Sequence, residues 1–281
     1  MVLLGKYSIF AMLSLVASLA FAQVDTKSLQ ALIAEAEELV LKSKRTDALK
    51  LLGAEWQKAK PQTKAALALK MDELARVFMT ERGQKAFELG QSMAVDKGNM
   101  AEPQYVESLK AEDNNVSVLL ALAALKIKEK NWAQALESLT LIETLLPASR
   151  EVKVLRLKAL LAASNLDQAQ LALASLQPVP KKYDVEELSA ELLLRQEKFV
   201  DAKLKIAELV KKQPENPDMH YLKWKLEEQQ KRLGRQSGEK YLELCKNLAP
   251  TSQKQLSQNP FRCLEQLEVA KILGEFEAQT R

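Results

Sequence analysis

The sequence predicts an all-α protein, a solenoid in which antiparallel helix pairs are stacked one after another. Good helix formers (Ala, Leu, Lys, Glu and Gln) dominate, whereas 281 residues include only 8 glycines and 9 prolines, and aromatic residues make up 5%. The chain also repeats, because the small residues Ala101, Ala135, Ala169 and Ala202 recur at intervals of 34, 34 and 33 residues. A fixed period in this range is typical of stacked supersecondary units rather than of a single globular core.

Residues 1–22 have the features of a cleavable signal peptide. Lys6 precedes an apolar run of about 16 residues, and this run ends in Ala20-Phe21-Ala22, a small-x-small pattern that signal peptidase accepts. The run is shorter than the roughly 20 residues that span a bilayer as a helix, so an uncleaved membrane anchor is the less favoured alternative. We expect cleavage after Ala22, export to a periplasm or full secretion, and no stable membrane insertion afterwards.

Residues 23–82 are expected to form a degenerate helical region ahead of the regular repeats. Residues 32–52 look like one helix pair, with Ala36 and Ala48 as the small residues of its two helices. Residues 62–80 predict an additional helix that breaks the register of the repeat.

Residues 83–252 hold the repeats, and each repeat contains two predicted helices. The first helices of three successive repeats cover 116–128, 151–163 and 185–196, each followed by a turn of three or four residues and a second helix. Turns this short make paired helices antiparallel neighbours. In each second helix the recurrent alanine lets the first helix approach closely, and a proline near the end stops the unit.

Residues 253–281 depart from the repeat and predict a C-terminal capping helix that begins at Pro260. The apolar residues on one side of this helix are Leu264, Leu267, Ala270, Ile272 and Leu273. Cys245, in the last repeat, and Cys263, in the tail, are the only cysteines. In an exported protein a disulfide between them is favoured, and it would tether the cap to the stack; two separate buried thiols are the alternative.

The repeat resembles the tetratricopeptide repeat (TPR), a 34-residue helix–turn–helix unit. In the repeat over 116–149 the residues that match its consensus positions are Leu119, Leu122, Ala123, Ala135, Leu139, Ile142 and Pro147. The resemblance is specific across 83–216 and weaker elsewhere. It implies a right-handed superhelix whose concave groove is lined by the first helix of each pair, and a protein that binds other proteins.

The resemblance also implies which residues face the groove. The candidate partner-binding residues are Leu120, Ala124, Ile127, Val154, Lys158, Leu161, Glu191, Leu194 and Trp224. Trp132 is expected to pack the turn between two helices. This groove would be apolar in its middle and charged toward its C-terminal end, which suits a helix or an extended segment of a partner. The alternative is that the protein's own N- or C-terminal helix fills it.

The sequence contains no pattern that predicts catalysis. It has no G-x-S-x-G, H-E-x-x-H or C-x-x-C motif and no glycine-rich phosphate loop. His220 is the only histidine, so a four-ligand metal site is not expected, and helix-entry packing is favoured over a role as a general base. A net charge of +4 with interleaved acidic and basic residues gives no argument for nucleic-acid binding. The prediction is a protein that is not an enzyme and needs no cofactor and no metal.

The function that these features favour is that of an exported, periplasmic scaffold for protein–protein interactions. Two alternatives stay open: a non-catalytic accessory protein of the peptidoglycan machinery of the cell wall, and a homo-oligomeric structural protein of the envelope whose grooves hold a neighbour's terminal helix. Nothing in the sequence chooses the partner.

Overall fold

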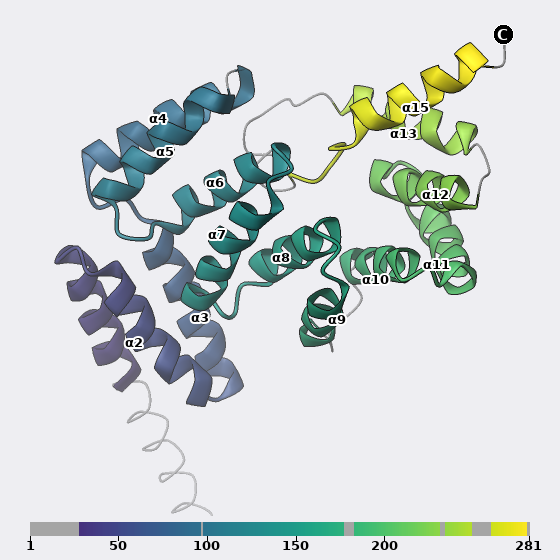
Figure 1. Cartoon of the computed structure of the whole chain (residues 1–281). Helices are drawn as coiled ribbons and strands as arrows, with labels where there is room; N and C mark the ends of the chain where they lie inside the picture. Colours follow the sequence, from purple (N-terminus) through teal and green to yellow (C-terminus); the bar gives the residue numbers. More distant parts are fainter. Residues whose placement is uncertain (1–27, 97, 177–182, 231–233, 249–259, 280–281) are drawn as a thin grey trace, which may run out of the picture.

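A computed structural model describes residues 28–96, 98–176, 183–230, 234–248 and 260–279. These residues form helices joined by short turns, and no strand occurs among them (Figure 1). The expected signal peptide lies outside the described residues. Within the described part of the chain, no helix combines the length and the apolar character that crossing a membrane requires.

A helix over residues 28–41 comes first in the described chain. The helices that follow are α2 (Arg45–Lys58), α3 (Pro61–Arg76), α4 (Glu81–Asp96), α5 (Gly98–Ala111), α6 (Val116–Lys128), α7 (Trp132–Leu145), α8 (Arg150–Ala162), α9 (Leu166–Ser175), α10 (Tyr183–Arg195), α11 (Phe199–Lys212), α12 (Pro217–Gln229), α13 (Arg235–Asn247) and α15 (Gln266–Gln279).

From α4 onward the helices pack as consecutive pairs: α4 with α5, α6 with α7, α8 with α9, α10 with α11, and α12 with α13. Each pair contacts the next through its second helix, and α8, α10 and α12 also contact one another in sequence. This is the packing of a helical solenoid, and Figure 1 shows the pairs following one another through the molecule. The predicted TPR-like stack of antiparallel helix pairs is confirmed.

The same turn ends the first helix of three successive pairs. Lys130, Ser164 and Glu197 adopt a left-handed conformation, with φ of 56°, 58° and 59°. The amide of each residue bonds the carbonyl three positions earlier, and the next amide bonds the carbonyl five positions before it. These two bonds define a Schellman motif. Because the turn recurs after 34 and 33 residues, the repeat of the sequence is also a repeat of the backbone.

Small residues are fully buried in the paired helices. The alanines among them, each 0% exposed, are Ala36, Ala48, Ala101, Ala135, Ala169 and Ala202. In the α12–α13 pair Gly238 takes this place, because a Cβ atom there would lie 2.9 Å from Cδ1 of Trp224. A larger residue at these positions would force the two helices apart.

Helix α6 is enclosed on several sides. The α4–α5 hairpin packs against it, α7 is its partner, and α3 contacts it as well. Its sequence, VSVLLALAALKIK, is apolar along nearly its whole length, as expected for a helix with packed neighbours around it. The additional helix that the sequence predicts ahead of the repeats is therefore present as α3, and it packs onto the repeat region rather than extending the stack.

A buried ion pair joins α2 to the end of α5. The side chains of Arg45 and Glu112 are both fully buried, with Nη2 of Arg45 2.8 Å from Oε2 of Glu112. Arg45 also donates to the backbone carbonyls of Leu74, Val77 and Asp113. Glu112 in turn accepts from the amides of Met79 and Thr80 and from the Thr80 hydroxyl. Two charges thus satisfy backbone groups at the α3–α4 connection, and we refer to this network as the Arg45–Glu112 hub.

The C-terminal helix begins later than the sequence predicts. Residues 260–265 form turns, and α15 starts at Gln266 rather than at Pro260. Cys263 has a φ of 58°, a left-handed conformation that a right-handed helix cannot contain. The predicted apolar face is also wrong in two positions, because Leu267, at 87% exposure, and Ala270 are exposed whereas Val269 is fully buried.

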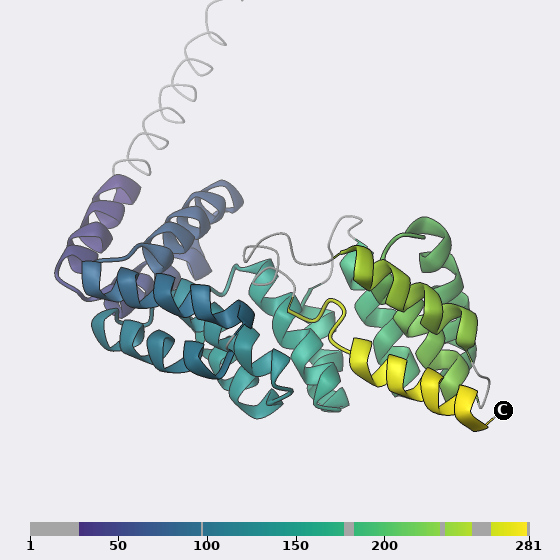
Figure 2. The ribbon, with the colours of Figure 1, turned by 90° about the horizontal axis from the view of Figure 1, so that it is seen from above.

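The tail is tied to the last pair as expected. Cys245 on α13 and Cys263 form a disulfide, with their Cα atoms 5.7 Å apart. Helix α15 packs against α13, where Val269 joins Trp224 and Tyr241 in one buried cluster. Residues 260–265, which we call the strap, connect to the start of α15 and extend back to the α6–α7 end of the solenoid (Figures 1 and 2).

Candidate functional site

A small cavity lies between the first helices of the last three pairs and the strap. Its walls come from α8, α10 and α12 on one side and from Phe261, Leu264 and Glu265 of the strap on the other, with Trp132 at one end. Its volume is about 70 Å³. This is room for a handful of water molecules, so a peptide does not fit while the strap is in place.

Charged side chains of consecutive first helices line the groove wall. The ammonium of Lys158 on α8 lies 2.9 Å from the carboxylate of Glu187 on α10, and both side chains are largely buried. Burial by itself lowers the pKa of Lys158, but Glu187, Asp218 and Glu191 raise it above its ordinary value. Burial raises the pKa of Glu187, against the lowering effect of Lys158. The pair therefore forms an ionic link between two neighbouring repeats on the concave side.

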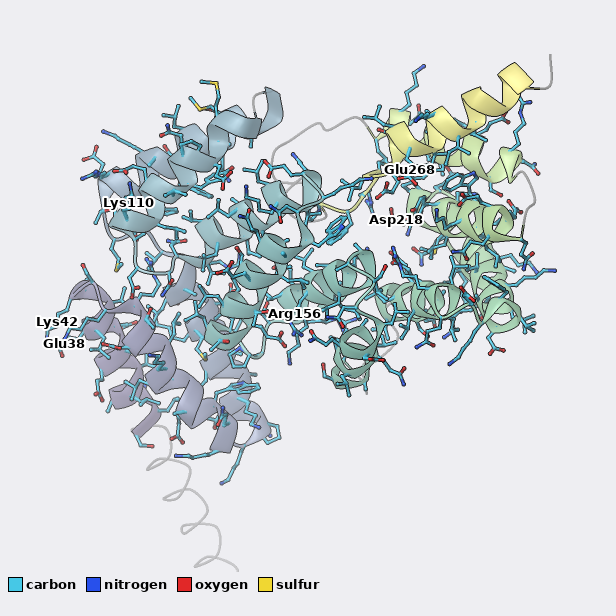
Figure 3. The ribbon with its side chains drawn as sticks, in the orientation of Figure 1. Glu38, Lys42, Lys110, Arg156, Asp218 and Glu268 are labelled. Carbon is cyan, nitrogen blue, oxygen red and sulfur yellow. A yellow bond between two sulfur atoms is a disulfide. The ribbon has the colours of Figure 1, made fainter. Side chains whose placement is uncertain are left out.

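Further carboxylates continue this wall toward α12. Glu191 pairs with Arg195 one helical turn later, at 2.9 Å, and Asp218 stands at the start of α12. Figure 3 shows Asp218 on the side of α12 along which the strap and the start of α15 run. The hydroxyls of Tyr221 and Tyr241 complete this end of the cavity, and burial raises the pKa of both, which keeps them protonated.

At its α7 end the strap is held by an aromatic and an ionic contact. The rings of Phe261 and Trp132 are stacked, with 6.3 Å between their centroids and 7° between their planes. Nζ of Lys130, in the turn before α7, lies 2.6 Å from Glu265 and 3.4 Å from Glu268. These contacts join residues that are more than 120 positions apart in the sequence, whereas the repeats of a solenoid otherwise contact only their neighbours.

At its α13 end the strap is fixed covalently, by a charged contact and by packing. Besides the disulfide, Arg262 approaches Asp218 at 3.9 Å, and Cys263 packs in the buried cluster that contains Tyr241. The strap thus crosses the concave side from α7 to α13. Its apolar residues belong to two cores at once, because Phe261 and Leu264 pack against the large cluster that extends from the first described helix to α8, and Cys263 packs against the cluster of α12, α13 and α15.

The structure brings together only part of the predicted partner-binding set. Lys158 and Glu191 both line the cavity. The members that are buried between helices are Leu120, Ala124, Ile127, Leu161 and Leu194, and Val154 is half-buried against the α8–α10 core. Trp224 is 1% exposed and lies beneath α13 and α15. Their role as partner contacts stays a prediction, and in this conformation the buried members are not accessible to a partner.

Sequence reasoning missed the aromatic residues that hold the strap. Trp132 was expected only to pack a turn, and Phe261 and Tyr241 were not singled out. A signal was available, since Phe261 lies two residues from a cysteine that was expected to form a tether. A disulfide of this kind places the flanking residues near the body of the protein, although it does not specify which helix they reach.

The one histidine and the potential metal ligands among the described side chains show no metal centre. Nε2 of His220 lies 2.7 Å from the carbonyl oxygen of Pro214, which agrees with packing at the entry of α12. No group of three or more potential ligands among the described His, Cys, Asp and Glu residues is placed to hold a metal ion. What the site offers is a surface of paired charges and aromatic rings, which is suited to holding a peptide segment.

Comparisons with known proteins assign no function to the chain. No protein-family model and no curated protein matches the sequence. Among solved structures, the chain is similar to the crystal structure of a tetratricopeptide repeat protein from Parabacteroides merdae, at 15% sequence identity and a TM-score of 0.48. The match covers 88% of this chain and 98% of that one. The helix pairs, their recurrent Schellman turn and the buried small residues themselves define the class: a TPR-like helical repeat protein.

Proposed function

We propose that this protein is a scaffold for protein–protein interactions that binds an extended segment of a partner on the concave side of α8, α10 and α12. The observation that supports this most is that the surface already holds a peptide segment, the strap of the same chain. The strap is held there by ring stacking, ion pairs and apolar contacts. These are the interactions by which grooves of helical proteins recognise peptides.

The strap also indicates the chemistry of the partner segment. It places an aromatic ring on Trp132, a guanidinium near Asp218 and a carboxylate on Lys130. Phe261 and Glu265 are four residues apart, with the basic Arg262 directly after the aromatic residue. A partner segment that occupies the same surface therefore carries an aromatic residue, a basic residue next to it and an acidic residue about one helical turn later.

The protein acts outside the cytoplasm and has no catalytic activity of its own. Export is supported by the signal-like residues 1–22 and by the disulfide, because disulfides persist in oxidising compartments such as a periplasm. A scaffold role without catalysis is consistent with a concave surface on which each charged side chain that lines the groove wall is already engaged by another.

A photo-crosslinking experiment tests this proposal. p-Benzoylphenylalanine replaces Tyr221, an aromatic residue that lines the cavity, and in a matched variant it replaces Leu171 on the second helix α9, which is 73% exposed. Both probes are placed in a Cys263→Ala background, because the strap covers the cavity while the disulfide holds it. We expect the probe at position 221 to capture a partner segment with the aromatic–basic–acidic pattern when irradiated in the cell envelope. Capture of the same partners at both positions, or of no partner at position 221, would contradict a binding role for the concave side.

A further inference from the structure

The strap adopts a conformation that its own sequence disfavours. Asn259 is a good N-cap residue, Pro260 fits the first position of a helix, and the apolar pattern continues through Leu264 into α15. The structure instead has turns over 260–265. A local conflict of this kind between sequence and conformation is typical of strained or functional positions, because other segments are locally consistent with their structure.

The conflict centres on Cys263. Its φ of 58° belongs to the left-handed region, which residues with a side chain adopt at a cost. Lys130, Ser164 and Glu197 have similar φ values, but each of them ends a helix in a Schellman turn. Cys263 differs because it stands in a segment where the sequence predicts a continuing helix. Its sulfur is bonded to Cys245 on α13, and this bond keeps Cys263 in a position that a continuous helix through residue 263 does not allow.

We propose that the Cys245–Cys263 disulfide is a redox latch for the concave surface. In the oxidised protein the disulfide holds the strap across the groove. On reduction, residues 260–265 extend α15 toward its N-terminus, which withdraws Phe261 from Trp132 and exposes the wall formed by α8, α10 and α12. The availability of this wall to a partner rests on the proposed function, whereas the change in the strap does not.

The chemistry of the latch is thiol–disulfide exchange with a dithiol reductant. A thiolate of the reductant attacks the sulfur of Cys263, the less buried of the two cysteines, and forms a mixed disulfide while Cys245 leaves as a thiolate and takes up a proton. The second thiol of the reductant then attacks the reductant's first sulfur, which is bonded to Cys263 in the mixed disulfide. This step frees Cys263 as a thiol. The reductant becomes a disulfide, and two electrons and two protons pass to the protein.

The remaining contacts of the strap are weaker than those that anchor α15. The ion pairs of Lys130 and Arg262 are partly exposed, and exposed pairs contribute little. Helix α15 is anchored by Val269, which is fully buried against α13, and we expect this contact to persist after reduction. Removing a cross-link between residues 18 positions apart lowers the ratio of docked to released strap on the order of a hundredfold. Reduction therefore frees the strap and leaves the cap in place.

Fluorine NMR on the full chain tests the latch directly. A trifluoromethyl-phenylalanine at position 261 reports stacking on Trp132 through its chemical shift. We expect a shifted signal in the oxidised protein and movement to the position of a solvent-exposed ring after treatment with dithiothreitol; a Trp132→Leu variant gives the unstacked reference. A signal that stays at its oxidised position after alkylation and mass measurement have confirmed two free thiols would overturn the proposal.

A matched pair of variants tests whether helix extension drives the release. Cys263→Ala and Cys263→Gly both lack the disulfide, but alanine favours the helix whereas glycine accepts the left-handed conformation. We expect the strap to be released in the alanine variant. In the glycine variant, the ratio of docked to released strap should be on the order of thirtyfold higher. Full docking in both variants would overturn the latch, and equal release in both would overturn helix extension. If the strap is released but no partner segment binds, the proposed function fails and the latch stands.

Discussion

The Arg45–Glu112 hub makes the N-terminal half of the protein sensitive to a single substitution. Glu112→Ala leaves the buried guanidinium of Arg45 without a counter-ion and removes the acceptor for the amides of Met79 and Thr80. Removing one partner of a buried ion pair costs about 3–5 kcal/mol. Arg45 retains three backbone carbonyls as acceptors, while the half-buried amides regain some water, so we expect the free energy of unfolding to fall by about 4 kcal/mol.

A double variant distinguishes the hub from a simple ion pair. Where two buried charges bond only each other, their joint replacement by apolar residues is often neutral. Here both charges also satisfy backbone groups, so Arg45→Met with Glu112→Leu orphans those groups and recovers only part of the loss. If each single variant costs about 4 kcal/mol, additive effects would give about 8 kcal/mol, whereas we expect about 5 kcal/mol for the double variant.

Urea unfolding followed by circular dichroism at 222 nm measures these differences. Glu107→Ala on α5, five residues before Glu112, removes an exposed ion pair with Arg82 and serves as the control, for which we expect little change. A loss of under about 1 kcal/mol for Glu112→Ala, or a double variant as stable as the wild type, would refute the account of the hub.

Three further predictions concern acid sensitivity and the repeat itself. Burial raises the pKa of Glu112, but the hydrogen bonds from Arg45 and from Met79 and Thr80 outweigh it and hold this pKa below its ordinary value. The stabilisation is therefore complete above the unfolded pKa of about 4.3 and is lost as the pH falls through the folded pKa, so an acid titration of unfolding should be less steep for Glu112→Gln. Gly238→Ala places a Cβ 2.9 Å from the Trp224 ring and should cost about 1–3 kcal/mol in urea unfolding, whereas no loss would contradict the close helix contact. Glu197→Gly relieves a left-handed φ and should raise the free energy of unfolding by about 0.5–1 kcal/mol. As a control, glycine at the exposed helical Lys203 should lower it by about 1 kcal/mol. Equal effects of the two substitutions would argue against the Schellman turn.

The repeat could be predicted from the sequence because its determinants are local. The spacing of Ala135, Ala169 and Ala202 reports helix–helix contacts within one unit, and the structure buries all three. The start of α15 could not be predicted in the same way. The sequence from Pro260 favours a helix, and a disulfide to another helix overrides that preference at Cys263.

The residues that line the cavity could be predicted only in part, again because only some of the determinants are local in the sequence. Lys158 and Glu191 were assigned to the groove from their place in the repeat, and both line the cavity. Leu120 was assigned by the same rule, but it is buried in the cluster against which Phe261 and Leu264 of the strap pack. A repeat pattern specifies which face of a helix is turned toward the concave side, whereas the segments that cover that face come from distant parts of the chain. Phe261, about 130 residues after Trp132, is such a case.

If the concave side binds peptide segments, the strap competes with them for the same surface. The most direct measurement is the affinity of a fluorescein-labelled peptide with the sequence of residues 257–268, carrying serine in place of the cysteine, for the full-length protein by fluorescence anisotropy. We predict that the peptide binds Cys263→Ala on the order of a hundredfold more tightly than the oxidised wild type, and that a further Trp132→Ala substitution abolishes this binding. Equal affinity for the two proteins, or binding that persists without Trp132, would contradict the claim.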